Sequence, residues 1–392
     1  MIKESPNIDM LSTDLHSQHL SRRDWTSACL GGLAGSLVFA SHCSAVDASS
    51  KHRAIQRAVE FVLSKQSPDG AWRSEQYGVL RGGSELTPFI AFVLNELPVK
   101  TQAVSLAVEL ARKYLIKLAE GEMNFTYPVY SSAFASIVLD KANQPVDRLL
   151  KYLEKHRYGG HNGWKPTDAR FGGWGYQPFP PRWTKTSGNI FPGPNLSATL
   201  IGLAALRRSG VAADEARIRE IRQFVLRCQN FATNAASATD FDDGGFFFSP
   251  TDQVRNKAGM ETASTGVRCF RSYGSTTADG LRALRLCGLQ EDHQRVVAAR
   301  GWLMKHFSAT SHPGQFVESR KAVREAYYYY YCWSTAHALS QCEEQGDTRV
   351  AEIQRELMKR QRTDGSWQNE KFDGKEDDPL IATPLALAAL HR

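Results

Sequence analysis

The apolar residues of this chain fall into pairs of segments with helical spacing, and the two members of each pair differ in polarity. The first member carries charged residues on one face, as in 146–155 and 296–307, which is typical of a helix on the outside of a domain. The second member is rich in Ala, Ser, Thr and Leu, as in 196–206 and 275–286, which is typical of a helix surrounded by others. The pattern predicts an all-α fold of about six helical hairpins.

Two of these hairpins share a turn of matching sequence. A helix runs into Gln66, and an Asp-Gly pair then leads to Trp72. The same order recurs near the end of the chain, at Gln361 and Trp367. Asp-Gly is a strong turn signal, and each copy is followed by a second helix that opens on Thr-Pro, at 87–88 and 383–384, where a hydroxyl cap precedes Pro at the first helical position. Weaker copies of the turn lie between these two.

The Gln, Gly and Trp of these turns resemble the QW motif of squalene-hopene cyclases and oxidosqualene cyclases, and the Gly-Gly-Phe turn at 244–246 is similar to that of protein prenyltransferase β subunits. Both families share a closed ring of six helical hairpins, the α/α toroid, and the resemblance implies this fold for residues 49–392. It also implies that Gln66, Trp72, Gln361 and Trp367 are structural, with the glutamine tying the turn to neighbouring helix ends. A toroid encloses a central cavity, and the lining of that cavity determines the function.

Residues 1–48 have a different character. Arg22 and Arg23 precede a short, Gly-rich apolar stretch that ends in small residues near Ala48, and the bulky apolar Trp25 follows the pair. This order resembles a twin-arginine export signal, and the stretch is too short and too mildly apolar for a membrane-spanning helix. We therefore expect an exported, periplasmic or otherwise extracytoplasmic protein with a single toroid domain at 49–392.

Composition excludes several classes of protein. Hydrophobic residues make up 42% of the chain and charged residues 23%, as in a soluble domain that buries a large core. The net charge is +7, but basic residues are scattered among acidic ones, so no nucleic-acid partner is expected. The seven cysteines form no Cys-x-x-Cys pair and have no His at metal-ligand spacing. We expect neither a bound metal nor another cofactor.

The chain also departs from the zinc-dependent prenyltransferases that it resembles. In that family Asp, Cys and His ligands come from two inner helices. Here the first of these helices lacks the Asp-x-Cys start, and Tyr328 stands at the position of the histidine when Cys332 is aligned with the cysteine of the family. Zinc-dependent protein prenylation is therefore not expected.

Two aspartates are candidates for acid or base chemistry. Residues 240–243 read Asp-Phe-Asp-Asp, similar to the acid motif of class II terpene cyclases, in which the middle Asp protonates an alkene or epoxide. Thr-Ala follows in those enzymes, whereas Gly-Gly follows here, which places Asp242 on an exposed turn without the burial that keeps a carboxyl protonated. Asp279, one helical turn past Ser275, is the better candidate and Asp242 the weaker one.

Five consecutive tyrosines at 327–331 cannot all point the same way on a helix, and Tyr327, Tyr330 and Tyr331 share one face. We expect these three, with Tyr273 and Glu325, to line the cavity. Aromatic faces stabilise carbocations by about 0.5 to 2 kcal/mol each, while tyrosine hydroxyls equally suit a sugar or a peptide.

Three functions are compatible with these features. The first is a cyclase-like isomerase or a prenyltransferase-like enzyme that holds an isoprenoid or other apolar molecule in an aromatic cavity, with peripheral contact to a membrane. The second is a non-catalytic toroid that binds a ligand or a protein, and the third is a polysaccharide-active toroid. A cavity lined by Phe and Leu favours the first function, whereas two carboxylates with Trp faces favour the third.

Replacing Arg22 and Arg23 together by Lys is expected to leave the precursor uncleaved in the cytoplasm, because twin-arginine transport depends on the guanidinium pair. Precursor and mature bands in cell fractions measure this. Processing of the double variant at the wild-type rate would contradict an export signal at these residues.

Overall fold

A computed structural model describes residues 47–98, 100–139, 145–185, 193–231, 241–264, 266, 268–341 and 347–392. The chain divides into a unit Met1–Cys43, which lies outside the described residues, and a unit Ser44–Arg392, to which the following description refers. The expected twin-arginine signal at Arg22 and Arg23 lies outside the described residues, and export stays a prediction.

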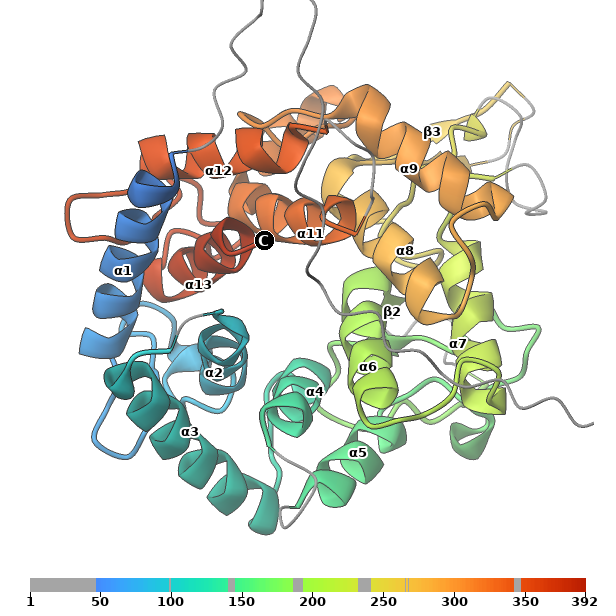
Figure 1. Ribbon diagram of the computed structural model, residues 1–392. Helices are drawn as coiled ribbons and strands as arrows, with labels where there is room; N and C mark the ends of the chain where they lie inside the picture. The colour runs from blue at the N-terminus through green and yellow to red at the C-terminus, as the bar shows by residue number, and fades with distance from the viewer. Residues whose placement is uncertain are drawn as a thin grey trace, which may run out of the picture. The chain divides into compact units, whose positions relative to one another are not determined.

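Outer and inner helices alternate along the described part of the chain and form two concentric layers (Figure 1). The outer helices are α1 (Ala48–Ser64), α3 (Gln102–Glu120), α5 (Val146–Lys155), α7 (Ala216–Arg227), α9 (Gln294–His306) and α12 (Arg349–Arg360). The inner helices are α2 (Thr87–Glu96), α4 (Pro128–Val138), α6 (Leu196–Arg208), α8 (Gly274–Leu286), α11 (Tyr328–Leu339) and α13 (Pro379–Leu390). Successive inner helices pack on one another, and α13 packs against α2. The expected α/α toroid is confirmed.

The remaining elements are short. Helix α10 (Lys321–Arg324) precedes α11, strand β1 (Trp174–Gly175) pairs antiparallel with β2 (Pro194–Asn195), and β3 (Met260–Thr262) pairs antiparallel with β4 (Arg268–Phe270). All of them belong to loops that lead from an outer helix to the following inner helix. These loops therefore lie at the end of the ring where the inner helices begin.

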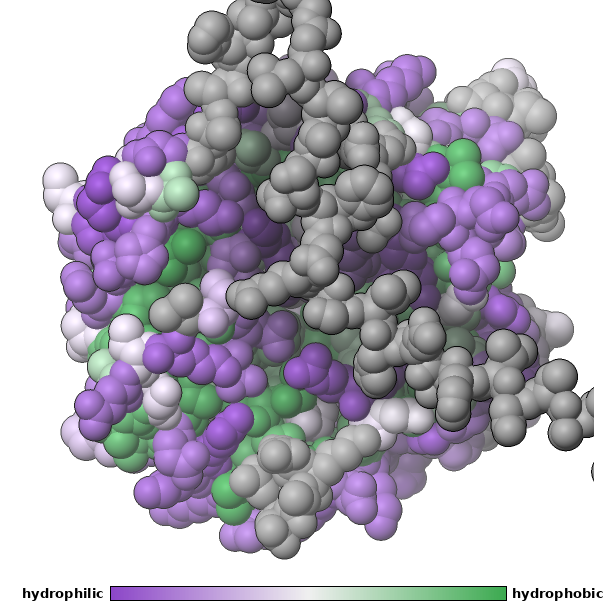
Figure 2. Space-filling model, viewed as in Figure 1, coloured by the Kyte–Doolittle hydropathy of each residue, from purple (hydrophilic) through white to green (hydrophobic). Residues whose placement is uncertain are grey.

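The two layers follow from the polarity of their sequences. In α5 the buried residues Val146, Leu149 and Leu153 form one stripe, which leaves the opposite face to solvent. In α13 every residue from Ala382 to Leu390 is buried, because this helix has neighbours on all sides. On the face shown in Figure 2, hydrophilic residues predominate at the periphery, over the outer helices.

A side-chain amide ties three of the turns to the next hairpin. Nε2 of Gln66 donates to the carbonyl of Gly70 in its own turn and to that of Ala107 on α3, both at 2.9 Å. Gln229 makes the equivalent pair of bonds, one of them to α9. Gln361 donates to its own turn at 2.9 Å and to Ala54 on α1 at 2.8 Å. The last hairpin is therefore bonded to the first, which closes the ring.

A buried aromatic ring lies beside these turns. Nε1 of Trp72 and of Trp367 each donates to a carbonyl of its own outer helix at 2.8 Å. Their backbone N–H groups donate at 3.0 Å to the hydroxyls of Thr87 and Thr383 on the inner helices. Both rings have 0% exposed surface, and the indole and backbone N–H groups of both residues are paired. The tryptophan thus locks the outer helix of a hairpin to its inner helix.

The last inner helix begins earlier than its Thr-Pro sequence predicts. It starts at Pro379, where Oδ1 of Asp378 accepts a hydrogen bond from the backbone N–H of Leu380 at 2.9 Å. Pro384 therefore lies inside the helix rather than at its first position. The carboxylate cap accounts for the difference, because it supplies the partner that a helix start requires.

Gly70 and Gly365 sit at the tightest points of their turns, with φ of +89° and +86°. A Cβ at either position would also collide with the backbone of the next outer helix, at Leu110 and at Arg57. Glycine is needed both for the left-handed conformation and for this close approach.

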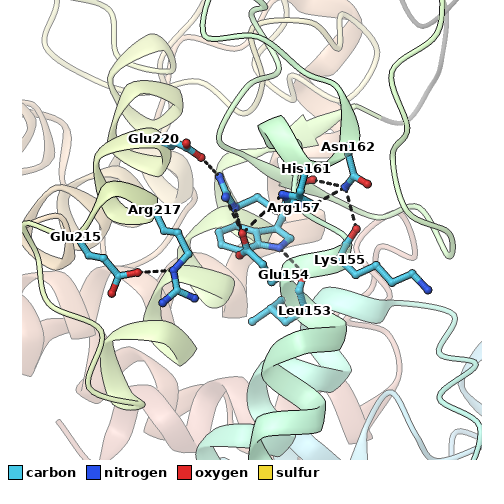
Figure 3. A network of polar contacts seen from close by, with 10 residues as sticks. Leu153, Glu154, Lys155, Arg157, His161, Asn162, Glu215, Arg217 and Glu220 are labelled. Carbon is cyan, nitrogen blue, oxygen red and sulfur yellow. Dashed lines mark hydrogen bonds and ion pairs between the residues drawn. The ribbon is translucent and has the colours of Figure 1, made fainter.

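The third hairpin uses an arginine where the first, fourth and sixth use glutamine, and Figure 3 shows the contacts of this arginine. Arg157 is 3% exposed and binds Glu220 on α7 and Glu154 on α5, each at 2.6 Å. Trp174 occupies the position that Trp72 and Trp367 have in their hairpins, and its Nε1 donates to the carbonyl of Leu153 on α5 at 2.9 Å. An ion pair therefore links this turn to the next outer helix.

Replacing Gln361 by Met is expected to lower the free energy of unfolding by about 1 to 3 kcal/mol, because two buried carbonyls lose their donor while the side-chain length is kept. Denaturation by urea measures the change. Gln253→Met, at an exposed position, is the matched control and should stay within about 0.5 kcal/mol of the wild type. Equal effects of the two substitutions would show that the closing bond does not stabilise the ring.

Candidate functional site

A cavity of about 680 Å³, here called the aromatic cavity, lies at the end of the ring where the inner helices begin. Its wall comes from the first turns of α2, α4 and α13, from α11, and from the loops that precede α6, α8 and α11. Such a volume suits a small-molecule ligand. The apolar and aromatic lining residues are Leu80, Leu86, Phe89, Tyr127, Tyr130, Phe134, Tyr176, Pro178, Tyr327, Trp333, Leu380 and Ile381. The charged ones are Glu85, Arg255, Asp373 and Lys375.

The aromatic rings of this wall are in contact with one another. The ring centroid of Phe89 lies 5.1 Å from that of Phe134 and 5.3 Å from that of Trp333. The centroids of Tyr130 and Tyr176 are 5.9 Å apart. Faces of this kind suit an apolar ligand or one that carries positive charge.

Exposed apolar side chains flank the aromatic cavity. Val79, Phe179, Val254 and Phe372 are 48% to 71% exposed, and each adjoins in sequence a residue that lines the cavity. Clustered exposed apolar groups mark interaction surfaces, whereas scattered ones do not. None of the described helices is long and apolar enough to cross a membrane. Peripheral contact with a membrane stays a prediction.

Asp279 lies on α8 behind the wall of the cavity, with 0% exposed surface. Hydroxyls of Ser197 and Tyr330 donate to its Oδ2 at 2.7 Å and 2.9 Å, and that of Ser334 donates to Oδ1 at 2.5 Å. Nη1 of Arg282 stands 3.9 Å from Oδ1. Burial raises the pKa of Asp279 above its ordinary value, although the guanidinium and the hydroxyls oppose this shift. The carboxyl therefore takes up a proton more readily than an exposed aspartate does.

Three tyrosines lie between Asp279 and the aromatic cavity. Tyr330 donates to Asp279, the hydroxyl of Tyr130 is close enough to Tyr330 for Tyr330 to influence the pKa of Tyr130, and Tyr176 is next to Tyr130, with ring centroids 5.9 Å apart. Tyr130 and Tyr176 line the cavity, whereas Asp279 does not. Burial raises the pKa of all three tyrosines well above the ordinary value, so their hydroxyls stay protonated and both donate and accept. The three hydroxyls therefore lie in series between the buried carboxyl and the cavity.

Glu376, in the loop before α13, holds the start of the tyrosine-rich helix α11. Its carboxylate accepts hydrogen bonds from the backbone N–H groups of Tyr329 and Tyr330, at 2.9 Å and 2.8 Å. These are N–H groups that a helix start leaves without an internal partner. Burial raises the pKa of Glu376 to about 8, although the two N–H groups and the nearby charge of Lys257 lower it. Glu376 therefore titrates close to neutral pH.

Lys257 is a buried cation beside the same wall. Its Nζ lies 4.2 Å from the ring centroid of Tyr327 and 4.4 Å from that of Phe248. Burial lowers its pKa to about 8, although the charges of Asp279 and Glu376 raise it. The aromatic wall thus already stabilises one positive charge through its ring faces.

The structure separates the tyrosines that the sequence predicts to line the cavity. Tyr327 lines it, and Tyr330 reaches it through Tyr130. Tyr331 instead stacks on His312, with centroids 5.2 Å apart, and donates to the backbone of the loop after α9. Tyr273 is fully buried in the same region. The expectation for Tyr331 and Tyr273 is corrected, because consecutive helical residues point in different directions and only part of one face meets the cavity.

Glu325 and Asp242 also lie outside the lining. Glu325 forms an ion pair with Arg324 at 2.7 Å, which corrects the expectation that it lines the cavity. Asp242 is exposed on the turn before Gly244, as the sequence predicts. Its neighbour Asp243 is held by the hydroxyl of Ser272 at 2.8 Å and by Nε1 of Trp302 at 3.0 Å. Asp240, the first residue of this motif, lies outside the described residues.

The sequence pattern does not reveal Tyr130, Tyr176, Trp333 or Glu376. Tyr130 lies in the first turn of an inner helix, so aligning the starts of all inner helices is the signal that points to it. Glu376 directly precedes an acidic pair at 377–378, but its role depends on a neighbouring hairpin. Among the described side chains, no group of three or more His, Cys, Asp or Glu is placed to hold a metal ion.

No family model matches the chain, and the search of curated proteins found no match. Solved structures share its fold. The apo type II terpene cyclase MstE from Scytonema superposes with a TM-score of 0.53 at 14% identity, covering 88% of this chain and 97% of the cyclase. The GH76A alpha-1,6-mannanase from Salegentibacter sp. HEL1_6 gives 0.56 at 8% identity, covering 87% of this chain and 98% of the mannanase. A protein from Actinoplanes gives 0.52 at 17% identity, covering 87% and 98%.

Likenesses at these identities show the α/α toroid and no particular reaction. The predicted resemblance is thus confirmed for the fold that this chain shares with a terpene cyclase. The finer resemblance to squalene-hopene cyclases remains an interpretation of the QW-like turns.

The raised pKa of Glu376 predicts a pH-dependent contribution to stability. Glu376 stays protonated up to about pH 8 in the folded protein, whereas glutamate in the unfolded chain releases its proton near pH 4.5. The stabilisation that this difference provides is therefore complete below pH 4.5 and is lost as the pH rises through 8. From pH 6.5 to 8 the free energy of unfolding should fall by roughly 1 to 2 kcal/mol more in the wild type than in Glu376→Gln. Denaturation curves at several pH values check this, with Glu370→Gln, exposed on the same loop, as control. Parallel profiles for the wild type and Glu376→Gln would rule the contribution out.

Proposed function

We propose that this protein binds an isoprenoid or a similarly apolar molecule in the aromatic cavity and isomerises it by proton transfer through the tyrosine chain. The observation that carries this proposal is one buried carboxyl, Asp279, hydrogen-bonded to Tyr330, whose neighbour Tyr130 lines a cavity rich in Phe, Tyr and Leu. The aromatic part of this lining can stabilise a reactive cation, and Tyr330 offers the proton a route to a buried carboxyl.

The proposed reaction balances without a cofactor. Protonated Asp279 passes its proton to Tyr330, and the hydroxyls of Tyr330 and Tyr130 relay it to a carbon of an alkene in the cavity. A C–H bond forms, and the alkene electron pair leaves a carbocation that the aromatic faces stabilise. The cation then loses a proton from a neighbouring carbon, and the hydroxyl chain returns this proton to Asp279. Substrate and product are isomers.

Two features support the assignment of the ligand class. The walls at Phe89, Phe134 and Leu380 offer no hydrogen-bonding side chains, which suits a hydrocarbon better than a sugar. MstE, on the same fold, has been solved with geranylgeranyl dihydroxybenzoate as substrate and with merosterolic acid A as product. These complexes are consistent with an apolar ligand in such a ring.

A second candidate function is the hydrolysis of a polysaccharide. Glu85 and Asp373 both line the aromatic cavity, and glycoside hydrolysis commonly uses a pair of carboxylates. GH76A, on the same fold, has been solved with alpha-1,6-mannotriose. Glu85 and Asp373 make this function testable alongside the first.

The test is to incubate the protein with squalene and with geranylgeranyl dihydroxybenzoate and to identify products by mass spectrometry. Replacing Asp279 by Asn should reduce isomer formation roughly 10²- to 10⁴-fold, the range for loss of a general acid, and Tyr330→Phe should also reduce it because the relay is broken. Asp242→Asn, at an exposed carboxyl outside the lining, is the matched control and should leave the rate unchanged.

The other functions give different results in the same experiment. Product loss in Asp242→Asn with full activity of Asp279→Asn would overturn the proposed role of Asp279. Cleavage of alpha-mannan that depends on Glu85 and Asp373 would favour the polysaccharide function. Binding of these ligands without any product would indicate a non-catalytic toroid.

A further inference from the structure

A second cavity, of about 430 Å³, lies at the opposite end of the inner helices, where they finish. It is here called the basic cavity. Four arginines line it: Arg207 and Arg208 from α6, and Arg282 and Arg285 from α8. Among the described residues that line it, Glu96 is the acidic one, and its Oε1 lies 3.7 Å from Nη2 of Arg208. The lining therefore carries an excess of positive charge.

Cations in the last turn of a helix interact favourably with its dipole, and this accounts for Arg207 and Arg208 taken alone. It does not account for Arg282, which lies a full turn before the end of α8 and is 8% exposed. Burying a guanidinium costs free energy unless it is paired. Arg282 has a long ion pair with Asp279 at 3.9 Å, donates to the hydroxyl of Ser334 at 3.2 Å, and lies over the ring of Trp333. A guanidinium has five N–H donors, so Arg282 retains the capacity to bind an anion.

Two further polar atoms in this lining are buried without a hydrogen-bond partner among the described residues. They are Nε1 of Trp333, whose side chain is 2% exposed, and Nδ1 of His337. Burial and the charges of Arg282 and Arg285 hold the pKa of His337 well below its ordinary value, so its ring is neutral. Buried polar atoms in native proteins are normally paired, so unpaired ones beside a cavity are consistent with a ligand there.

Apart from Gln341, the rest of the lining is apolar. Phe92, Phe134 and Ile137 stand on the side of the cavity that faces α2 and α4, across from the arginines of α6 and α8. A bare inorganic anion would leave this apolar side without contacts, whereas an anion with a short apolar body would meet both sides.

We propose that the basic cavity is a binding site for an amphiphilic organic anion, with a phosphate or carboxylate headgroup on Arg207, Arg208 and Arg282 and an apolar body against Phe92 and Phe134. This site is separate from the aromatic cavity and does not depend on the proposed isomerase function. Phe134 and Trp333 form part of the wall of both cavities.

The test is isothermal titration of the full-length protein with n-octyl phosphate, octanoate, 1-octanol and inorganic phosphate. The two amphiphilic anions should bind, and their relative affinity distinguishes a phosphate site from a carboxylate site. Arg207→Gln combined with Arg208→Gln should weaken anion binding about tenfold or more, because charge-assisted hydrogen bonds are lost. Binding should also weaken as the salt concentration rises.

Arg219→Gln, at an exposed arginine of α7, is the matched control and should leave anion binding unchanged. Arg208→Gln alone is the second variant, for the case that the double variant does not fold. The Arg208 side chain is 63% exposed, so thermal melting of this single variant should show an intact fold. Anion binding that equals 1-octanol binding, or that survives the double substitution in the folded protein, would overturn the site. Tyr130→Phe removes a hydroxyl of the proposed relay in the aromatic cavity, so a loss of isomer formation with unchanged octyl phosphate binding separates this proposal from the isomerase proposal.

Discussion

The hydrogen bond from a turn glutamine to the next outer helix is the interaction on which the ring depends. Gln66, Gln229 and Gln361 make it, and Arg157 replaces it by an ion pair. The amide binds backbone carbonyls, so it fixes the distance and direction between two hairpins while leaving the side chains of the partner helix free to vary. This explains how hairpins of different sequence occupy equivalent places in one ring.

Because the turns fix the arrangement of neighbouring hairpins, the inner helices can differ in the groups that they bury. Polar atoms inside the ring must nevertheless be paired, since an unpaired buried charge is costly. Asp279 meets this requirement through three hydroxyls, and Glu376 meets it through two backbone N–H groups of α11. The network that makes the burial of Asp279 tolerable is also its connection to the aromatic cavity, so stability and proposed chemistry rest on the same hydroxyls.

The ring was predictable from the sequence because its signals are local. The polarity of each helix and the spacing of Gln66 and Trp72 depend on a few consecutive residues, and Asp279 follows from its position on an inner helix. The lining was harder to predict, because it depends on how each helix is rotated against its neighbours. The sequence places Tyr331 on one helical face with Tyr327, but α11 begins only at Tyr328 and Tyr331 packs on His312. Tyr130 and Glu376 act across hairpin boundaries that no sequence period reveals.

Closure between Gln361 and Ala54 also determines when the fold can be completed during synthesis. The two residues are 307 positions apart, so one side of α1 stays uncovered until the last hairpin has been synthesised. Contacts of such sequence separation slow folding, and open arcs expose apolar surface at both ends. Until residues near 361 have left the ribosome, the nascent chain is an incomplete arc that depends on chaperones or on rapid closure to avoid aggregation.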